Sequence, residues 1–143
     1  MRNTLKTDVA TAVTSYADVT GLNFPVRAGR TYKFRFELDY TCNATTTGSA
    51  FSINGPTSPT RLSYNVEKDL TTTSKTQLNG CSTYDADTAN ATSATTGANF
   101  ATIEGRITPS LDGSVVARFL SEVAVASGIT VKAGSSVEFF EVL

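Results

Sequence analysis

Residues 30–40 read RTYKFRFELDY. Their apolar positions are Tyr32, Phe34, Phe36, Leu38 and Tyr40, and a charged residue stands between each neighbouring pair. Because side chains alternate between the two faces of a β-strand, this pattern places an apolar row on one face and charges on the other. The stretch therefore predicts an antiparallel strand with one face in a core and the other in water.

The same two-residue period recurs along the chain. We expect further strands at residues 17–26, 50–54, 61–67, 100–108, 114–123, 129–131 and 135–143, with an irregular strand at 8–16. Residues 70–97 are mostly polar and predict loops around one strand near 74–78. Gly, Pro and the Asp112-Gly113 pair mark the turns, and no segment has helical spacing. The pattern predicts an all-β antiparallel sandwich or barrel.

The apolar faces of these strands supply a candidate core. We expect it to include Phe34, Phe36, Phe51, Ile53, Tyr64, Ile103, Ile107, Phe119 and Phe139. At 143 residues the chain is long enough to bury such a core in one domain.

Charge and hydropathy disfavour several classes of partner. The net charge is −1, from 12 basic and 13 acidic residues, and the basic residues form no cluster. This balance does not favour a nucleic-acid partner. No apolar run has the length of a signal peptide or of a membrane span, so we expect a soluble protein with no membrane partner.

The residue types disfavour catalysis. The chain has no histidine, which removes Ser-His-Asp and Cys-His arrangements and histidine-bound metals. A pair of catalytic carboxylates would have to come from Glu104, Glu122, Glu138 and Glu141. These alternate with Arg106 and Arg118, which predicts cross-strand salt bridges instead. We expect neither an enzymatic activity nor a cofactor.

Two smaller features leave alternatives open. Asp85 and Asp87 are the one close acid pair that could bind a hard cation, although a solvated loop is the favoured interpretation. Cys42 and Cys81 both lie in polar connections, where a disulfide is possible. Without a signal peptide, free thiols are the favoured interpretation.

Two strands carry apolar residues on both faces. Val116 and Leu120 oppose Phe119, and Phe140 and Val142 oppose Phe139. A sandwich strand needs only one buried face, so the second face calls for a cover. Either a long loop of the same chain, such as residues 70–97, or another copy of the chain could supply it. We favour the second copy.

Two segments resemble a domain of tailed-bacteriophage structural proteins. Residues 16–56 carry FPVRAGRTYKFRFELDY and TTTGSAFSINGP, and residues 101–143 carry EGRITPSLDGSVVARFLSE followed by KAGS and a final aromatic strand. Residues 68–97 lie outside the resemblance. It implies a jelly roll similar to the tumour-necrosis-factor type, trimeric about a threefold axis, with no cofactor and no catalytic site. Such domains occur as small virion proteins and as end domains of longer tail proteins.

The resemblance also implies a function. We expect a homotrimeric capsid decoration protein, made in the host cytoplasm, that binds the major capsid protein on the surface of the same virion. The alternative is a tail-associated or receptor-binding protein that recognises the host surface, and a cellular ligand-like trimer comes third. Few aromatic residues other than Tyr84 lie in the expected loops, which disfavours a sugar-binding head.

Specific residues follow from these expectations. The trimer interface is expected at Val116, Leu120, Phe140 and Val142. Residues 1–6 are expected to form a short arm ahead of the jelly-roll domain at 7–143. Arg2 and Lys6 on that arm are candidate capsid contacts, and a frayed terminus is the alternative.

Overall fold

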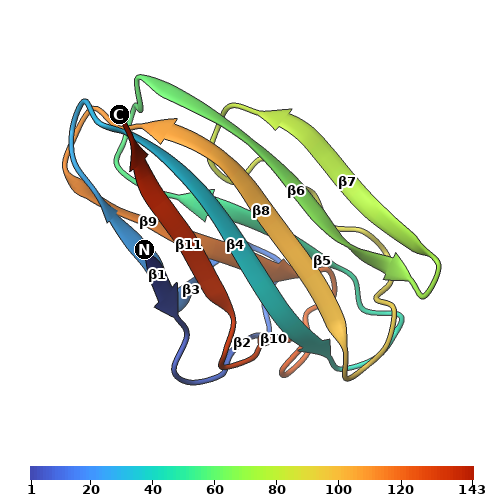
Figure 1. The fold of residues 1–143 in the computed structure, drawn as a ribbon. Helices are drawn as coiled ribbons and strands as arrows, with labels where there is room; N and C mark the ends of the chain where they lie inside the picture. The colour runs from blue at the N-terminus through green and yellow to red at the C-terminus, as the bar shows by residue number, and fades with distance from the viewer.

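The computed structural model describes all residues 1–143 and consists of strands joined by turns and loops. The strands are β1 (Arg2–Thr4), β2 (Val9–Thr11), β3 (Ala17–Val26), β4 (Thr31–Cys42), β5 (Ser49–Asn54), β6 (Arg61–Thr71), β7 (Ser74–Cys81), β8 (Asn99–Thr108), β9 (Gly113–Ser121), β10 (Ile129–Val131) and β11 (Ser136–Val142). They form two antiparallel sheets that pack face to face as a sandwich (Figure 1). The all-β sandwich expected from the alternating pattern is confirmed.

The larger sheet has the strand order β1-β11-β4-β8-β6-β7, and β10 pairs with both β4 and β2. The smaller sheet has the order β3-β9-β5 and lies behind the larger one in Figure 1. The chain changes sheet at β2–β3, β3–β4, β4–β5, β5–β6, β8–β9 and β9–β10. Most connections therefore run across the ends of the sandwich, where the loops gather.

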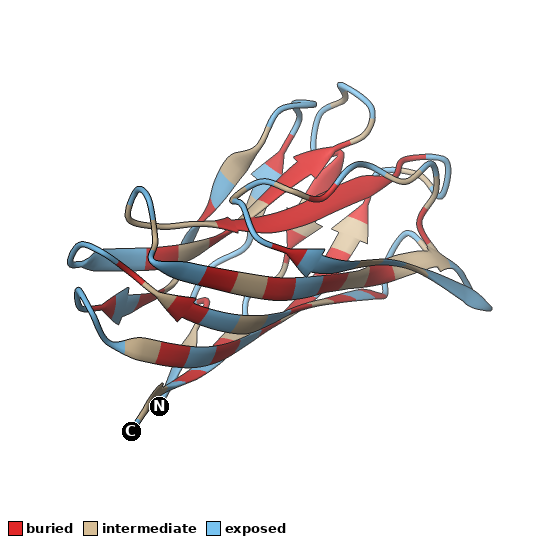
Figure 2. Ribbon diagram, turned by 90° about the horizontal axis from the view of Figure 1, so that it is seen from above, coloured by how far each residue is buried: buried red, intermediate tan, exposed pale blue.

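Strand β4 lies inside the larger sheet, between β11 and β8. Phe34 and Phe36 are 1% and 0% exposed, as its alternation predicts. The Phe24 ring of β3 stacks on Phe139 of β11 with centroids 4.9 Å apart, and it lies 5.6 Å from Phe34. This aromatic cluster joins the two sheets. Figure 2 shows the resulting alternation of buried and exposed residues along the strands.

All the expected core residues are buried. Phe34, Phe36, Phe51, Ile53, Tyr64, Ile103, Ile107, Phe119 and Phe139 belong to one cluster of 27 buried apolar residues. The predicted boundaries of the regular strands are also close, and residues 129–131 match β10. In contrast, only Val9–Thr11 of the irregular segment 8–16 forms a strand.

Residues 68–97 contain more structure than their composition predicts. β6 continues to Thr71 and forms a hairpin with β7, which itself continues to Cys81. Residues 82–98 form no strand, yet they lie beside the free edge of β5. The Asp85 and Asn90 amides donate to the Ile53 and Ser49 carbonyl oxygens at 3.4 and 3.2 Å. This connection, the 82–98 segment, closes one side of the sandwich.

Residues 1–6, expected as a short N-terminal arm, lie against the edge of the sandwich in the structure. Arg2–Thr4 form β1, which pairs with β11 at the edge of the larger sheet. Leu5 is only 2% exposed, its amide donates to the Ser135 carbonyl at 2.8 Å, and its carbonyl accepts from the Gly134 amide at 2.9 Å. The first residues are therefore held by ladder hydrogen bonds and by an apolar anchor, and they are not frayed.

Candidate interaction surfaces

The four residues expected at a subunit interface lie on two opposite faces of the sandwich. Phe140 and Val142 belong to β11 and point away from the core on the outer face of the larger sheet, since Phe139 points inward. Val116 and Leu120 belong to β9 and point outward from the smaller sheet, since Phe119 points inward. The four residues therefore do not lie on one common surface.

Phe140 is the most exposed of the four, at 54%. The strand register places it in one row with Lys33, Arg106 and Ser63 across β11, β4, β8 and β6. The Lys33 ammonium lies 5.9 Å from the centre of the Phe140 ring, within cation–π range. Phenylalanine is among the residues enriched in the cores of protein–protein interfaces.

The next row of the same face is charged with alternating sign. It runs Arg2, Glu138, Arg35, Glu104 and Asn65 across β1, β11, β4, β8 and β6. Within this row Arg35 Nη1 lies 2.7 Å from Glu104 Oε2. Phe140 is thus an apolar group at the border of a polar surface.

Leu120 does not fit the expected interface. It is only 8% exposed in the single chain, and its cross-strand neighbour Ala50 is fully buried. The chain itself therefore covers this part of the outer face of the smaller sheet, as the alternative of an intramolecular cover foresaw. Val116, further along β9, remains partly exposed and lies between Asn23 and Asn54.

Arg2 and Lys6, the candidate capsid contacts, are both exposed. Because Arg2 lies in β1 and Leu5 is buried next to Lys6, both cations are displayed from a fixed edge of the sandwich and not from a free arm.

The acid pair Asp85 and Asp87 is occupied by the protein's own cations. Asp87 is 5% exposed, and its Oδ2 accepts from Lys68 Nζ at 2.7 Å and from the Phe51 amide at 3.0 Å. Asp85 Oδ1 lies 3.1 Å from Arg118 Nε. The solvated loop expected for this pair is therefore wrong for Asp87, because the side chain enters the core. No group of three or more His, Cys, Asp or Glu residues is placed to hold a metal ion.

Burial and neighbouring charges shift the pKa values of two side chains in this cluster, Lys68 and Asp85. Burial lowers the pKa of Lys68, and the Asp87 carboxylate opposes this effect. Partial burial raises the pKa of Asp85, while the Arg118 guanidinium acts in the opposite direction. The cluster has the features of a structural ion-pair network, and its acids and bases neutralise one another.

The expected salt bridges form with other partners. Glu104 pairs with Arg35 and not with Arg106, and Glu141 lies 3.3 Å from Arg30. Arg118 pairs with Asp18 and Asp85. Glu122 Oε2 accepts from the Gly48 amide at 3.4 Å. The prediction of cross-strand pairing is therefore right in kind, since Arg35–Glu104 and Arg118–Asp18 join neighbouring strands, but the partners differ.

The two cysteines are free and buried, at the ends of β4 and β7. Cys42 Sγ donates to the Thr95 carbonyl at 3.1 Å. Burial raises the pKa of the Cys81 thiol, which holds it in the unreactive protonated form.

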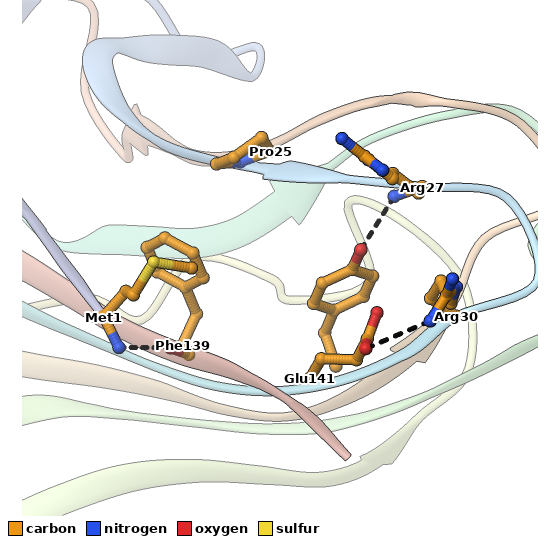
Figure 3. Close-up of a pocket in the computed structure, with 7 residues that line it drawn as sticks. Met1, Pro25, Arg27, Arg30, Phe139 and Glu141 are labelled. Atoms are coloured by element: carbon orange, nitrogen blue, oxygen red, sulfur yellow. Dashed lines mark hydrogen bonds and ion pairs between the residues drawn. The ribbon is translucent and has the colours of Figure 1, made fainter. Parts of the chain in front are cut away.

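A hollow of about 440 Å³ lies between β3 and β11, near the N-terminus (Figure 3). It is lined by Met1, Pro25, Arg27, Arg30, Tyr32, Phe139 and Glu141. Arg30 pairs with Glu141, and the Tyr32 hydroxyl accepts from the Arg27 amide at 3.0 Å. Most of the polar groups in this hollow are thus engaged with one another.

The structure contains no helix with the length and apolar character of a membrane span.

Comparison with known proteins gives weak similarity only. No protein-family model and no curated protein matches the chain. Among solved structures, a chain from the structure of infectious bursal disease virus Gx strain is similar, with a TM-score of 0.33 and 10% sequence identity. The match covers 99% of this chain and 40% of that chain. The infectious bursal disease virus VP2 subviral particle is similar at a TM-score of 0.29 and 11% identity, covering 100% of this chain and 40% of that one. The chain thus spans about two fifths of the length of these chains.

Proposed function

We propose that this chain is a non-enzymatic structural protein of a bacteriophage virion, and that it acts as a homotrimeric capsid decoration protein. The observation that carries the proposal is the exposed Phe140, 54% accessible at the border of a charged sheet face. Burial of this ring by a partner would contribute favourable free energy to an assembly. The resemblance of residues 16–56 and 101–143 to phage structural domains supplies the biological setting.

The placement of the patches supports a ring of subunits over a twofold dimer. A twofold contact joins the same patch on both copies, whereas a ring joins two different patches. Here the partly exposed Val116 and the exposed Phe140 lie on opposite faces of the sandwich. In the proposed trimer, the Phe140 face of one subunit contacts a different surface of the next.

The strand order supports a jelly roll as the finer description of the fold. β11 lies between β1 and β4 in the larger sheet, and β9 lies between β3 and β5 in the smaller one. Strands from the two ends of the sequence are thus interleaved in both sheets, as in a jelly roll. The β6–β7 hairpin departs from this pattern because it extends the larger sheet beyond β8.

The packing and hydrogen bonding of Tyr84 favour decoration over host recognition. Its hydroxyl donates to the Pro56 carbonyl at 2.8 Å, and its ring packs against the core. The aromatic residue that a sugar-binding loop would need is therefore committed to the fold. In the decoration role, three copies of a weak contact to the major capsid protein add up to firm attachment.

Two measurements test the proposal. Sedimentation equilibrium at micromolar concentration should give a trimer, and Phe140→Glu should shift it toward monomer. Phe100→Glu is the matched control, because Phe100 is a 43% exposed ring of β8 at the other end of the same sheet face. A wild-type monomer, or a Phe140→Glu trimer as stable as wild type, would contradict the proposed assembly.

Electron microscopy with a specific antibody then locates the protein on its virion. Many copies on the head support decoration. A few copies at the end of the tail would move the assignment to host recognition, and absence from the virion would overturn both.

A further inference from the structure

We propose that Asn79 is a site of spontaneous backbone modification, at which the Asn79-Gly80 pair converts slowly to aspartate and isoaspartate, and that Asn65 slows this conversion. Both residues of the pair are exposed. They belong to β7, which is the last strand of the larger sheet and has a free edge. Water therefore reaches the pair.

The pair forms a bulge in the β6–β7 ladder. Tyr64 is opposite Cys81 and Val66 is opposite Leu78, so one residue of β6 faces two residues of β7. Gly80 has a φ of +69°, which glycine adopts without strain. Apart from Gly80 itself and its two neighbours in the chain, no heavy atom lies within 4 Å of the position that a Cβ on Gly80 would occupy. The bulge thus leaves open space beside the backbone that must rearrange.

The chemistry needs only water. The Gly80 amide nitrogen attacks Cγ of Asn79, which forms a new C–N bond and a five-membered succinimide ring. The proton of the Gly80 amide passes to solvent, and the side-chain NH2 group takes up one proton from solvent and leaves as ammonia. Water then adds to one of the two ring carbonyls and opens the ring to aspartate or to isoaspartate. No oxidant or reductant takes part, and glycine permits ring closure because it has no side chain.

Asn65 holds the attacking atom in place. The Gly80 amide donates to Asn65 Oδ1 at 2.9 Å, so its proton is shared with a side chain of the neighbouring strand. Attack on Cγ requires this hydrogen bond to break. A net hydrogen bond of ordinary strength corresponds to a rate factor of up to about tenfold.

The second Asn-Gly pair, Asn54-Gly55, supplies an internal reference. Asn54 is the last residue of β5 and is paired with Val116. A Cβ on Gly55 would lie 2.9 Å from the Tyr84 hydroxyl, so this pair is crowded where Asn79-Gly80 is open. We therefore expect Asn79 to react faster than Asn54 in the folded protein.

The test is incubation of the intact protein at mildly alkaline pH, with peptide mapping by mass spectrometry and a separate assay for isoaspartate. Wild type should accumulate modified residue 79 ahead of residue 54, and Asn79→Gln should abolish the signal from the β7 peptide, because the longer side chain would need a larger ring. Asn65→Ala should accelerate the reaction at residue 79 severalfold. Asn65→Asp keeps an acceptor oxygen and should remain close to wild type.

Residue 54 distinguishes a local effect from partial unfolding. If Asn65→Ala accelerates both sites equally, the variant acts by loosening the fold, and the role assigned to Asn65 is overturned. Modification of residue 54 ahead of residue 79 in wild type, or no modification of residue 79 when the denatured protein reacts readily, would overturn the assignment of Asn79.

Discussion

Lys68 Nζ lies 2.7 Å from Asp87 Oδ2, and the two side chains are only 1% and 3% exposed. Lys68 occupies the inward face of β6, in line with Tyr64 and Val66. It also donates to the Thr88 carbonyl at 2.7 Å. A charge on a core face thus draws the 82–98 segment into the interior, where Asp87 also accepts the amide of Phe51 on the edge strand β5.

Removing one partner of this pair should be more damaging than removing both. Lys68→Met leaves a buried carboxylate without its counter-charge and should lower the free energy of unfolding by about 3–5 kcal/mol. Adding Asp87→Asn removes the uncompensated charge and keeps an oxygen that can accept the Phe51 amide, so the double variant should recover much of the loss. Denaturant unfolding of the four members of this cycle measures the coupling.

The pair Lys75–Glu67 is the matched control. Its atoms are also 2.7 Å apart, but the side chains are 58% and 35% exposed. Lys75→Met should change the stability by no more than about 1 kcal/mol. Equal effects of Lys68→Met and Lys75→Met would show that burial does not govern the strength of the Lys68–Asp87 pair.

Sequence periodicity predicts those strands that bury one face. In β4, charged residues alternate with large apolar ones, so the inward side is unambiguous and Phe34 and Phe36 are correctly placed. The Asp112-Gly113 turn and the strands on either side of it are likewise local signals. Each of these features is decided by neighbours in the sequence.

The features that alternation misses depend on partners far along the chain. The expected strand ends at residue 67, one residue before Lys68. Lysine is seldom buried, and the Asp87 carboxylate that pairs with Lys68 in the core lies 19 residues further along the chain. Leu120 is an apolar residue on the outer face of β9, and its position in the sequence does not say whether the same chain or a second copy covers it. Only the folded chain shows that Leu120 is already buried within one subunit. The position of Leu5 likewise depends on distant residues, because its backbone hydrogen bonds are made with Gly134 and Ser135.

Phe36→Ala should destabilise the protein by roughly 3–5 kcal/mol, because it leaves a cavity where the Phe24 ring packs, 6.0 Å away between centroids. Phe36 is fully buried. Phe100→Ala removes the same ring from a site that is 43% exposed and should cost much less. Thermal or denaturant unfolding compares the two. A melting temperature of Phe36→Ala near wild type would mean that the β4 core does not depend on this ring.

High pH should unfold the protein through its tyrosines. Burial raises the pKa of Tyr16, Tyr40, Tyr64 and Tyr84 above the ordinary value of 10.0. These neutral phenols contribute stability that is present below the unfolded pKa and is lost as the pH rises above it, because only the unfolded chain ionises readily. Phenolate absorbance should therefore appear together with the loss of β circular dichroism. Ionisation of these four tyrosines with the sheet signal intact would contradict this.

Leu5→Ala should destabilise the sandwich by about 2–5 kcal/mol, the range for truncation of a buried leucine. Leu5 is 2% exposed, and its δ-methyl group lies where a Cβ on Gly21 would come within 3.5 Å, so its side chain fills space against β3. Lys6→Ala changes the exposed neighbour and should leave unfolding within about 0.5 kcal/mol of wild type. Denaturant unfolding of both variants, followed by circular dichroism, makes the comparison. If Leu5→Ala is as stable as Lys6→Ala, the first residues contribute little to the core, and the N-terminal segment behaves as the short arm expected from the sequence.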